Sequence, residues 1–188
     1  MKHGTHKHAA SAAKGFTLIE IVLTIVILGT VAGLMVPFFN AIVRSPDPAI
    51  RERAISLGQA MMDEIMAKRW DENTPIGGGP LNTVESTRGS TAPAASLGPD
   101  GEARIDFDDV DDYNGINEVN NFTDQNGAAF VLTGYSRQVA VRYIASNTNP
   151  IDQNTPAAAG TTDTKLVVVR ITSPLGEVFN FVAVACNI

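Results

Sequence analysis

The longest apolar stretch of the chain covers residues 21–43, which carry no charge. As a helix with a rise of about 1.5 Å per residue, this stretch would extend about 34 Å, enough to cross a hydrocarbon core of about 30 Å. A cleaved secretory signal is one alternative, but its apolar region would be shorter and would end at small residues. The bulky Phe38 and Phe39 stand there instead. The pattern predicts a transmembrane helix over residues 16–43.

A second helical pattern follows two prolines. Asp47 suits a helix N-cap and Pro48 the first helical position, and the two closely spaced prolines predict a bend near Pro46. Apolar residues then recur every three or four positions, which predicts an amphipathic helix over residues 44–70. The apolar stripe consists of Ile50, Ala54, Leu57, Met61 and Ile65. The methionines expected to pack in the core are Met61, Met62 and Met66.

Three segments near the C-terminus have the composition of β-strands: residues 134–146, 164–173 and 177–187. The first alternates, and the residues predicted to share one of its faces are Tyr135, Arg137, Val139, Val141 and Tyr143. The other two segments are separated only by Pro174, Leu175 and Gly176. Because this connection is short, an antiparallel hairpin is expected. Strands packed on the stripe of the second helix predict an α+β fold, with a long N-terminal helix on a small antiparallel sheet.

Residues 71–129 lie between the predicted helix and the first predicted strand. They are rich in Gly, Pro, Asn, Asp, Ser and Thr, and they lack periodicity, which predicts an irregular connection. Turns are expected at Asn121–Phe122 and at Asn126–Gly127. The predicted globular domain therefore covers residues 71–188, with this irregular loop first and strands over about 134–187.

The irregular connection contains a dense acidic run. Its aspartates are Asp106, Asp108, Asp109, Asp111 and Asp112. Clustered carboxylates could bind calcium, but the EF-hand spacing fails, since taking Gly115 as the loop glycine puts Val110 first and Asn121 twelfth. We predict a solvated acidic loop and no metal site, with a calcium site over residues 106–118 as the alternative.

Composition limits the classes of function. The chain has 14 basic and 20 acidic residues; three of the basic residues and none of the acidic ones lie in positions 1–15, so the remainder carries a net charge of −9. Such a surface disfavours nucleic acid as a partner. All three histidines precede Phe16 and the only cysteine is Cys186, so Ser-His-Asp and Cys-His arrangements are not available without the leader. An enzyme is not expected, and no cofactor is predicted.

The one ionisable residue of the predicted transmembrane helix is Glu20. A carboxylate at membrane depth is costly and indicates a functional role if a partner can be named. An ordinary signal anchor, held with its basic leader inside, explains the apolar stretch but leaves Glu20 to reach the interface by snorkelling.

The segment KGFTLIE, residues 14–20, resembles the class III signal sequence of type IV pilins and type II secretion pseudopilins. The resemblance implies that prepilin peptidase cuts after Gly15, removes residues 1–15 as a leader, and methylates the new amine of Phe16. Gly29 and Pro37 also fall where family members commonly carry these residues. The resemblance implies loss of helix between them in filaments, and the ring of Pro37 predicts a kink.

The same resemblance names a partner for Glu20: the Phe16 amine of a neighbouring subunit in the assembled filament. Other pilin subunits, bound through the N-terminal helix, are therefore the expected partners. The implied location is the bacterial inner membrane, with the C-terminal domain in the periplasm, and then the pilus at the cell surface.

Two further segments, residues 57–79 and 97–115, resemble D-type minor pilins of the mannose-sensitive haemagglutinin (MSHA) pilus. The resemblance implies a minor pilin that contributes to pilus biogenesis and surface adhesion. This chain differs from some of those relatives, which carry extra cysteines. The alternatives are a type II secretion pseudopilin and a membrane-tethered calcium- or sugar-binding module that does not polymerise.

Overall fold

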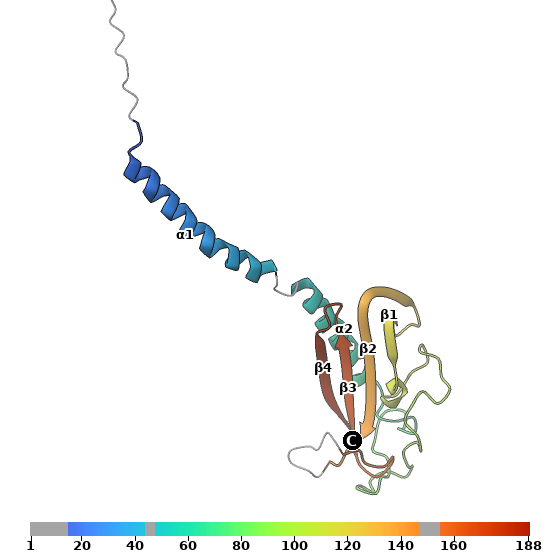
Figure 1. Ribbon diagram of the computed structural model, residues 1–188. Coiled ribbons are helices and arrows are strands. Elements are labelled where there is room, and N and C mark those ends of the chain that lie inside the picture. The colour runs from blue at the N-terminus through green and yellow to red at the C-terminus, as the bar shows by residue number, and fades with distance from the viewer. Residues whose placement is uncertain (1–14, 44–47, 147–154) are drawn as a thin grey trace, which may run out of the picture. The chain divides into compact units, whose positions relative to one another are not determined.

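The computed structural model describes residues 15–43, 48–146 and 155–188, without the side chains of residues 40–43. The chain divides into two compact units, Met1–Ser45 and Pro46–Ile188 (Figure 1). Most of the predicted leader, the predicted cap at Asp47 and the predicted bend near Pro46 lie outside the described residues.

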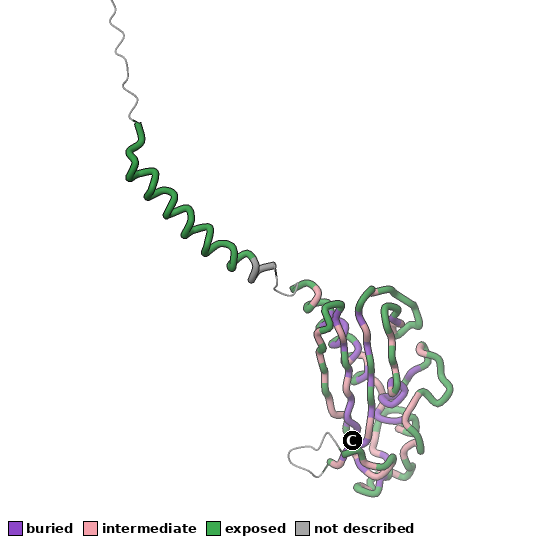
Figure 2. Tube along the Cα trace, in the orientation of Figure 1, coloured by how far each residue is buried: buried purple, intermediate pink, exposed green. Residues whose placement is uncertain are grey.

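The described part of the first unit contains one helix, α1, which covers Leu18–Val43 and continues through Pro37. Its segment Leu18–Phe39 is, among the described residues, the one helix long and apolar enough to cross a membrane. Every residue of this unit whose burial is described is exposed (Figure 2). An apolar helix exposed on all sides needs lipid or other helices around it.

The second unit begins with α2, Pro48–Met66. The predicted stripe is confirmed: Ala54, Leu57, Met61 and Ile65 are buried, and Ile50 packs partly buried against the same core. The core position predicted for the methionines is confirmed for Met61, which is buried, and for Met62, which packs partly buried against the core. It is wrong for Met66, which is exposed. After Met66, the Lys68 N–H closes a last turn on the Ile65 carbonyl, and the Arg69 N–H leaves the helix to donate to the Asp108 carbonyl of the acidic segment.

The sheet has four antiparallel strands in the order β1-β2-β3-β4 (Figure 1). The strands are β1 Asn117–Thr123, β2 Ala129–Tyr143, β3 Thr164–Thr172 and β4 Val178–Cys186. The predicted hairpin between β3 and β4 is confirmed. So is the predicted turn at Asn126–Gly127, where Gly127 adopts a φ of 77° between β1 and β2.

The first strand, β1, was not predicted, and the turn expected at Asn121–Phe122 is wrong. Both residues belong to β1, where Phe122 is fully buried and stacks on Phe130 with ring centroids 5.6 Å apart. Phe122 is the one buried residue of this edge strand, and Asn120 forms a bulge with a φ of 63°. Period-two alternation is therefore absent from its sequence.

The helix α2 covers one face of the sheet, which confirms the predicted α+β class. Three contacts show that α2 runs in the same direction as β4. Near the start of the helix, Arg51 bonds Glu177 just before β4; in the middle, Gly58 lies directly against the ring of Phe181; after the helix, the indole of Trp70 donates to the Ala185 carbonyl at 3.2 Å.

All five residues predicted to share a face of β2 are buried, Arg137 included. The charge of Arg137 is matched by Glu118 on β1, whose carboxylate lies 2.7 Å from its Nε, and the guanidinium lies over the ring of Phe122. Burial lowers the pKa of Arg137, and Glu118 opposes that change. The alternation of β2 was therefore a sound guide to burial even at a charged position.

Candidate functional site

The start of α1 carries the residues predicted for processing and assembly. Gly15, Phe16 and Thr17 precede the helix, and Thr17 acts as its N-cap. The Thr17 side-chain oxygen accepts a hydrogen bond from the backbone N–H of Glu20 at 3.3 Å, and its carbonyl accepts from the same N–H at 3.1 Å. The spacing Thr-x-x-Glu is that of a capping box, a signal in the sequence that the prediction did not use.

Glu20 lies in the first turn of α1 and is exposed. Among the residues that the structure describes, none forms a hydrogen bond or ion pair with its carboxylate. The helix hydroxyls are satisfied differently: Thr24 donates to the carbonyls of Glu20 and Ile21, and Thr30 donates to that of Ile27. These hydroxyls suit a bilayer because their hydrogen bonds stay within the helix, whereas the carboxylate of Glu20 has no such partner among the described residues.

The same helix offers an open surface at its two glycines. A Cβ placed on Gly29 or Gly33 would meet nothing within 4 Å. Small residues four apart allow a neighbouring helix to approach closely, so this surface suits packing against another α1. The roles predicted for Gly15, Phe16, Glu20 and Pro37 remain predictions.

Residues 10–36 match the family model described as the prokaryotic N-terminal methylation motif. This match supports a type IV pilin-like or pseudopilin subunit. It includes Gly15, Phe16 and Glu20, and it implies processing by prepilin peptidase and assembly with other pilins. Together with the apolar helix it is consistent with membrane anchoring of this pilin-like chain. No curated protein sequence and no solved structure matches the chain.

The acidic run of the globular unit was predicted to be solvated, and for three of its five aspartates that prediction is wrong. Asp106 and Asp108 are exposed, but Asp109, Asp111 and Asp112 are buried. Asp109 accepts hydrogen bonds from the backbone N–H groups of Asp111 and Asp112 at 2.8 and 3.1 Å. Asp112 accepts in return from the N–H groups of Asp108 and Asp109 at 2.9 and 3.0 Å. This reciprocal pattern fixes the short 3₁₀ helix η1, Asp111–Tyr113, and draws its carboxylates inward.

Two trios of carboxylates in this region could each surround a cation: Glu72, Asp108 and Asp109, and Glu102, Asp108 and Asp112. The three aspartates of these trios already have partners, since Asp108 pairs with Arg69, and Asp109 and Asp112 accept backbone N–H groups. These contacts explain the arrangement without an ion. Calcium binding stays a prediction, and calorimetry at millimolar calcium checks it.

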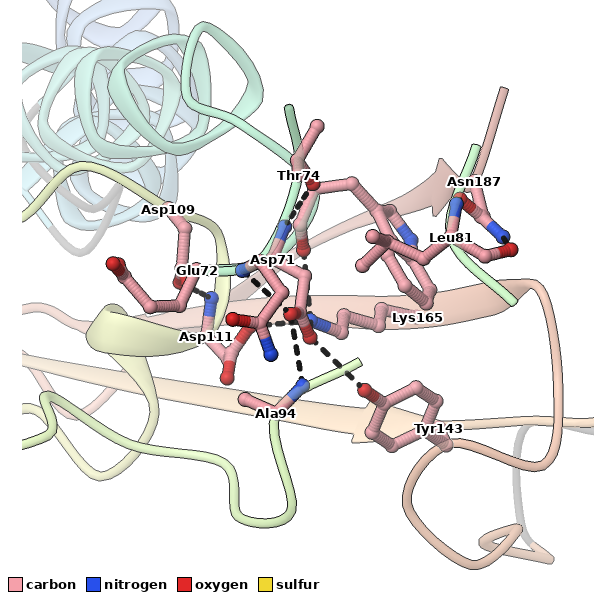
Figure 3. Close-up of polar contacts among 12 residues, drawn as sticks. Asp71, Glu72, Thr74, Leu81, Ala94, Asp109, Asp111, Tyr143, Lys165 and Asn187 are labelled. Atoms are coloured by element: carbon pink, nitrogen blue, oxygen red, sulfur yellow. Dashed lines mark hydrogen bonds and ion pairs between the residues drawn. The ribbon is translucent and has the colours of Figure 1, made fainter. Parts of the chain in front are cut away.

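The most enclosed charges of the described residues surround Lys165 of β3 (Figure 3). The ammonium of Lys165 donates to the Trp70 carbonyl at 2.7 Å, to Asp71 at 3.0 Å and to Asp111. Lys165, Asp71 and Asp111 are at most 1% exposed. The rings of Trp70 and Tyr143 lie 4.4 and 5.2 Å from the nitrogen, so the charges lie in a dry aromatic environment.

Asp71 anchors this cluster to three other parts of the unit. One of its oxygens accepts from the backbone N–H groups of Asn73 and Ala94 at 3.1 and 2.9 Å. The other accepts from Lys165 and from the Tyr143 hydroxyl, at 3.0 and 3.4 Å. The cluster therefore holds a long loop, two strands and η1 together.

Sequence reasoning missed this cluster. A signal was present, because Lys165 is in phase with Val167, Val169 and Ile171, which line the buried face of β3. A lysine at a core position of a strand requires a buried partner. Which carboxylates would meet it depends on contacts 54 and 94 residues away along the chain, and the local pattern does not give these.

Burial raises the pKa of Asp109 from 3.8 to about 8, and the neighbouring Asp111 and Asp112 add to that effect. Burial also raises the pKa of Asp111, although Lys165 opposes it. The buried site thus holds a proton on Asp109 at neutral pH, and the Asp109 side chain hydrogen-bonds that of Asp111.

This proton predicts a pH dependence of stability. Between about pH 4 and about pH 8 the folded state retains the Asp109 proton that the unfolded state releases, so this group makes the free energy of unfolding fall as pH rises. Asp109→Asn keeps an oxygen acceptor for both backbone N–H groups and cannot titrate. We expect the variant to lose part of this fall in thermal unfolding of the full chain in detergent, with Asp106→Asn as the exposed control. Equal pH profiles for Asp109→Asn and the unmodified protein would contradict the assignment.

Proposed function

We propose that this chain is a minor pilin subunit of a type IV pilus of the MSHA type, contributing to pilus biogenesis and surface adhesion rather than catalysing a reaction. The observation that carries the proposal is the methylation motif at the start of an apolar helix that is exposed on all described sides. The resemblance of residues 57–79 and 97–115 to D-type minor pilins favours the MSHA type.

The proposed route starts with cleavage after Gly15, which frees an amine on Phe16 directly before α1. The helix dipole disfavours a positive amine at the N-terminus of its own helix and favours the negative Glu20 in that first turn. A second subunit, displaced along the helix axis, brings its Glu20 to the amine of the first. The pair neutralises both charges within the apolar bundle, and this favours lateral association of subunits. Thr17 stays in the mature chain, so cleavage leaves the helix cap intact.

The test is the mass of the N-terminal peptide of the protein isolated from its native membrane. We expect the mature chain to begin at Phe16 and to carry one methyl group on its amine. Gly15→Val should retain residues 1–15, because the added side chain occupies the cleavage position, while Gly29→Ala should be processed normally. A native chain that still begins at Met1 would refute the pilin assignment and favour the membrane-tethered module.

A type II secretion pseudopilin is the second candidate, because the methylation motif is shared by both groups. Sheared surface filaments, probed with an antibody against the globular unit, distinguish the two. The subunit is expected in the pilus fraction of the unmodified strain. If the subunit is found only in the cell envelope, and deletion of its gene abolishes protein secretion, it belongs to the pseudopilus instead.

A further inference from the structure

The cluster around Lys165 brings an amine and a carboxyl group together in a closed, dry site (Figure 3). The Lys165 nitrogen contacts the Asp111 carboxylate, and neither side chain is more than 1% exposed. Trp70 and Tyr143 cover the nitrogen. An intramolecular condensation is accelerated most when the two reacting groups are held in contact and water is excluded.

We propose that Lys165 and Asp111 condense to an intramolecular amide bond, an isopeptide cross-link between β3 and η1. The proposal concerns the globular unit alone and is independent of the assignment to a pilus. It rests on the contact between the two groups, on their enclosure, and on two further carboxyl groups placed to move protons.

Asp71 and Asp109 are the proton-transfer residues of this site. Asp71 lies 3.0 Å from the Lys165 nitrogen, where its carboxylate is placed to take a proton from the ammonium. Asp109 is bonded to the Asp111 side chain, and its raised pKa leaves it with a proton to give. One carboxyl group therefore faces the nucleophile and the other faces the electrophile.

The step balances without an oxidant or any co-reactant. The ammonium of Lys165 passes a proton to Asp71, and the freed electron pair forms a bond to the Cγ carbon of Asp111 while Asp109 protonates an Asp111 oxygen. The C–O bond to that oxygen then breaks, and the oxygen leaves as water. The second proton from nitrogen restores Asp109, and the proton on Asp71 leaves with the water. The nitrogen has lost two protons, one water has formed, and nothing has been oxidised or reduced.

Burial favours the product over the reactants. A buried ammonium and a buried carboxylate each carry a desolvation cost that their attraction only partly offsets. The amide is neutral, so its formation removes the charges of Lys165 and Asp111 from the core, and the released water passes into bulk solvent. Asp71 keeps the hydrogen bonds from the Asn73 and Ala94 N–H groups and from the Tyr143 hydroxyl. The cross-link would also close the chain between residues 111 and 165, a loop that contains β1 and β2. Closing a long loop restricts the unfolded chain and stabilises the fold.

The test is mass spectrometry of the purified full chain under denaturing conditions. We expect the mass to be lower by one water molecule than the sequence predicts for the observed N-terminus. Trypsin should then give a branched peptide in which residues 105–137 are joined to residues 143–170, uncleaved after Lys165. An unmodified protein of full mass would overturn the proposal.

Variants assign the bond to its two residues. Lys165→Arg and Asp111→Ala should have full mass, whereas the control Lys68→Arg should keep the deficit, since Lys68 bonds only a backbone carbonyl near η1. Asp111→Asn should lose ammonia instead of water and reach the same product mass. A succinimide at Asp100–Gly101 would lose one water too, but inside a linear peptide. A deficit found there, and not in the branched peptide, would also overturn the proposal.

Discussion

Glu20→Ala is expected to reduce the share of this subunit in assembled filaments by about tenfold or more. Truncating one partner of a buried charge pair costs about 2–5 kcal/mol, much of it because the other charge stays buried and unpaired. The unpaired group here would be the Phe16 amine of the neighbouring subunit. Insertion into the membrane should not change, since the substitution makes α1 more apolar. Quantitative immunoblots of sheared filaments against the membrane fraction measure the ratio.

The matched control is Thr24→Ala, one turn further along α1. The Thr24 hydroxyl bonds only to carbonyls of its own helix, so its loss should leave filament incorporation nearly unchanged. If Glu20→Ala and Thr24→Ala enter filaments to the same extent, Glu20 has no role in pairing charges between subunits.

Lys165→Ala is expected to destabilise the globular unit by about 3–5 kcal/mol, because removal of one partner leaves uncompensated buried charges on the others. Asp71 and Asp111 are both buried, and without Lys165 the Asp111 carboxylate has neither a cation beside it nor the proposed cross-link. Domains of this size have stabilities of about 5–15 kcal/mol, so the loss is a large part of the total. Chemical denaturation followed by Trp70 fluorescence measures it, since the indole lies against the lysine.

Arg51→Ala provides the contrast. Arg51 forms an ion pair with Glu177 at the surface, and exposed pairs contribute little to stability. We expect its unfolding curve to lie close to that of the unmodified protein. A Lys165→Ala curve that coincides with the Arg51→Ala curve would show that the buried cluster does not stabilise the fold.

The sequence predicted what depends on local periodicity or on a local motif. The stripe of α2, the inward face of β2 and the hairpin of β3 and β4 each repeat a regular spacing, and burial follows that spacing. The segment KGFTLIE carries its signal within seven residues, and the family match covers it. The helix cap at Thr17 was equally local and could have been found from its spacing to Glu20.

The features that were missed depend on residues far apart in the chain. Phe122 is buried because Phe130 and Arg137 cover it, so β1 shows no alternation of its own. The aspartates of η1 turn inward because backbone N–H groups and Lys165 are there to receive them. Their composition, taken alone, is that of a solvated loop. A run of like charges is therefore a poor guide to exposure when a distant strand supplies the opposite charge.

The shared direction of α2 and β4 has a mechanical consequence. A pull on Pro48 along the axis of α2 acts lengthwise along β4, so the contacts from Ala54 to Ile65 bear the load together. A pull across the strand would peel them away one turn at a time. The ring of Phe181, which lies directly against Gly58, also obstructs sliding of α2 along β4.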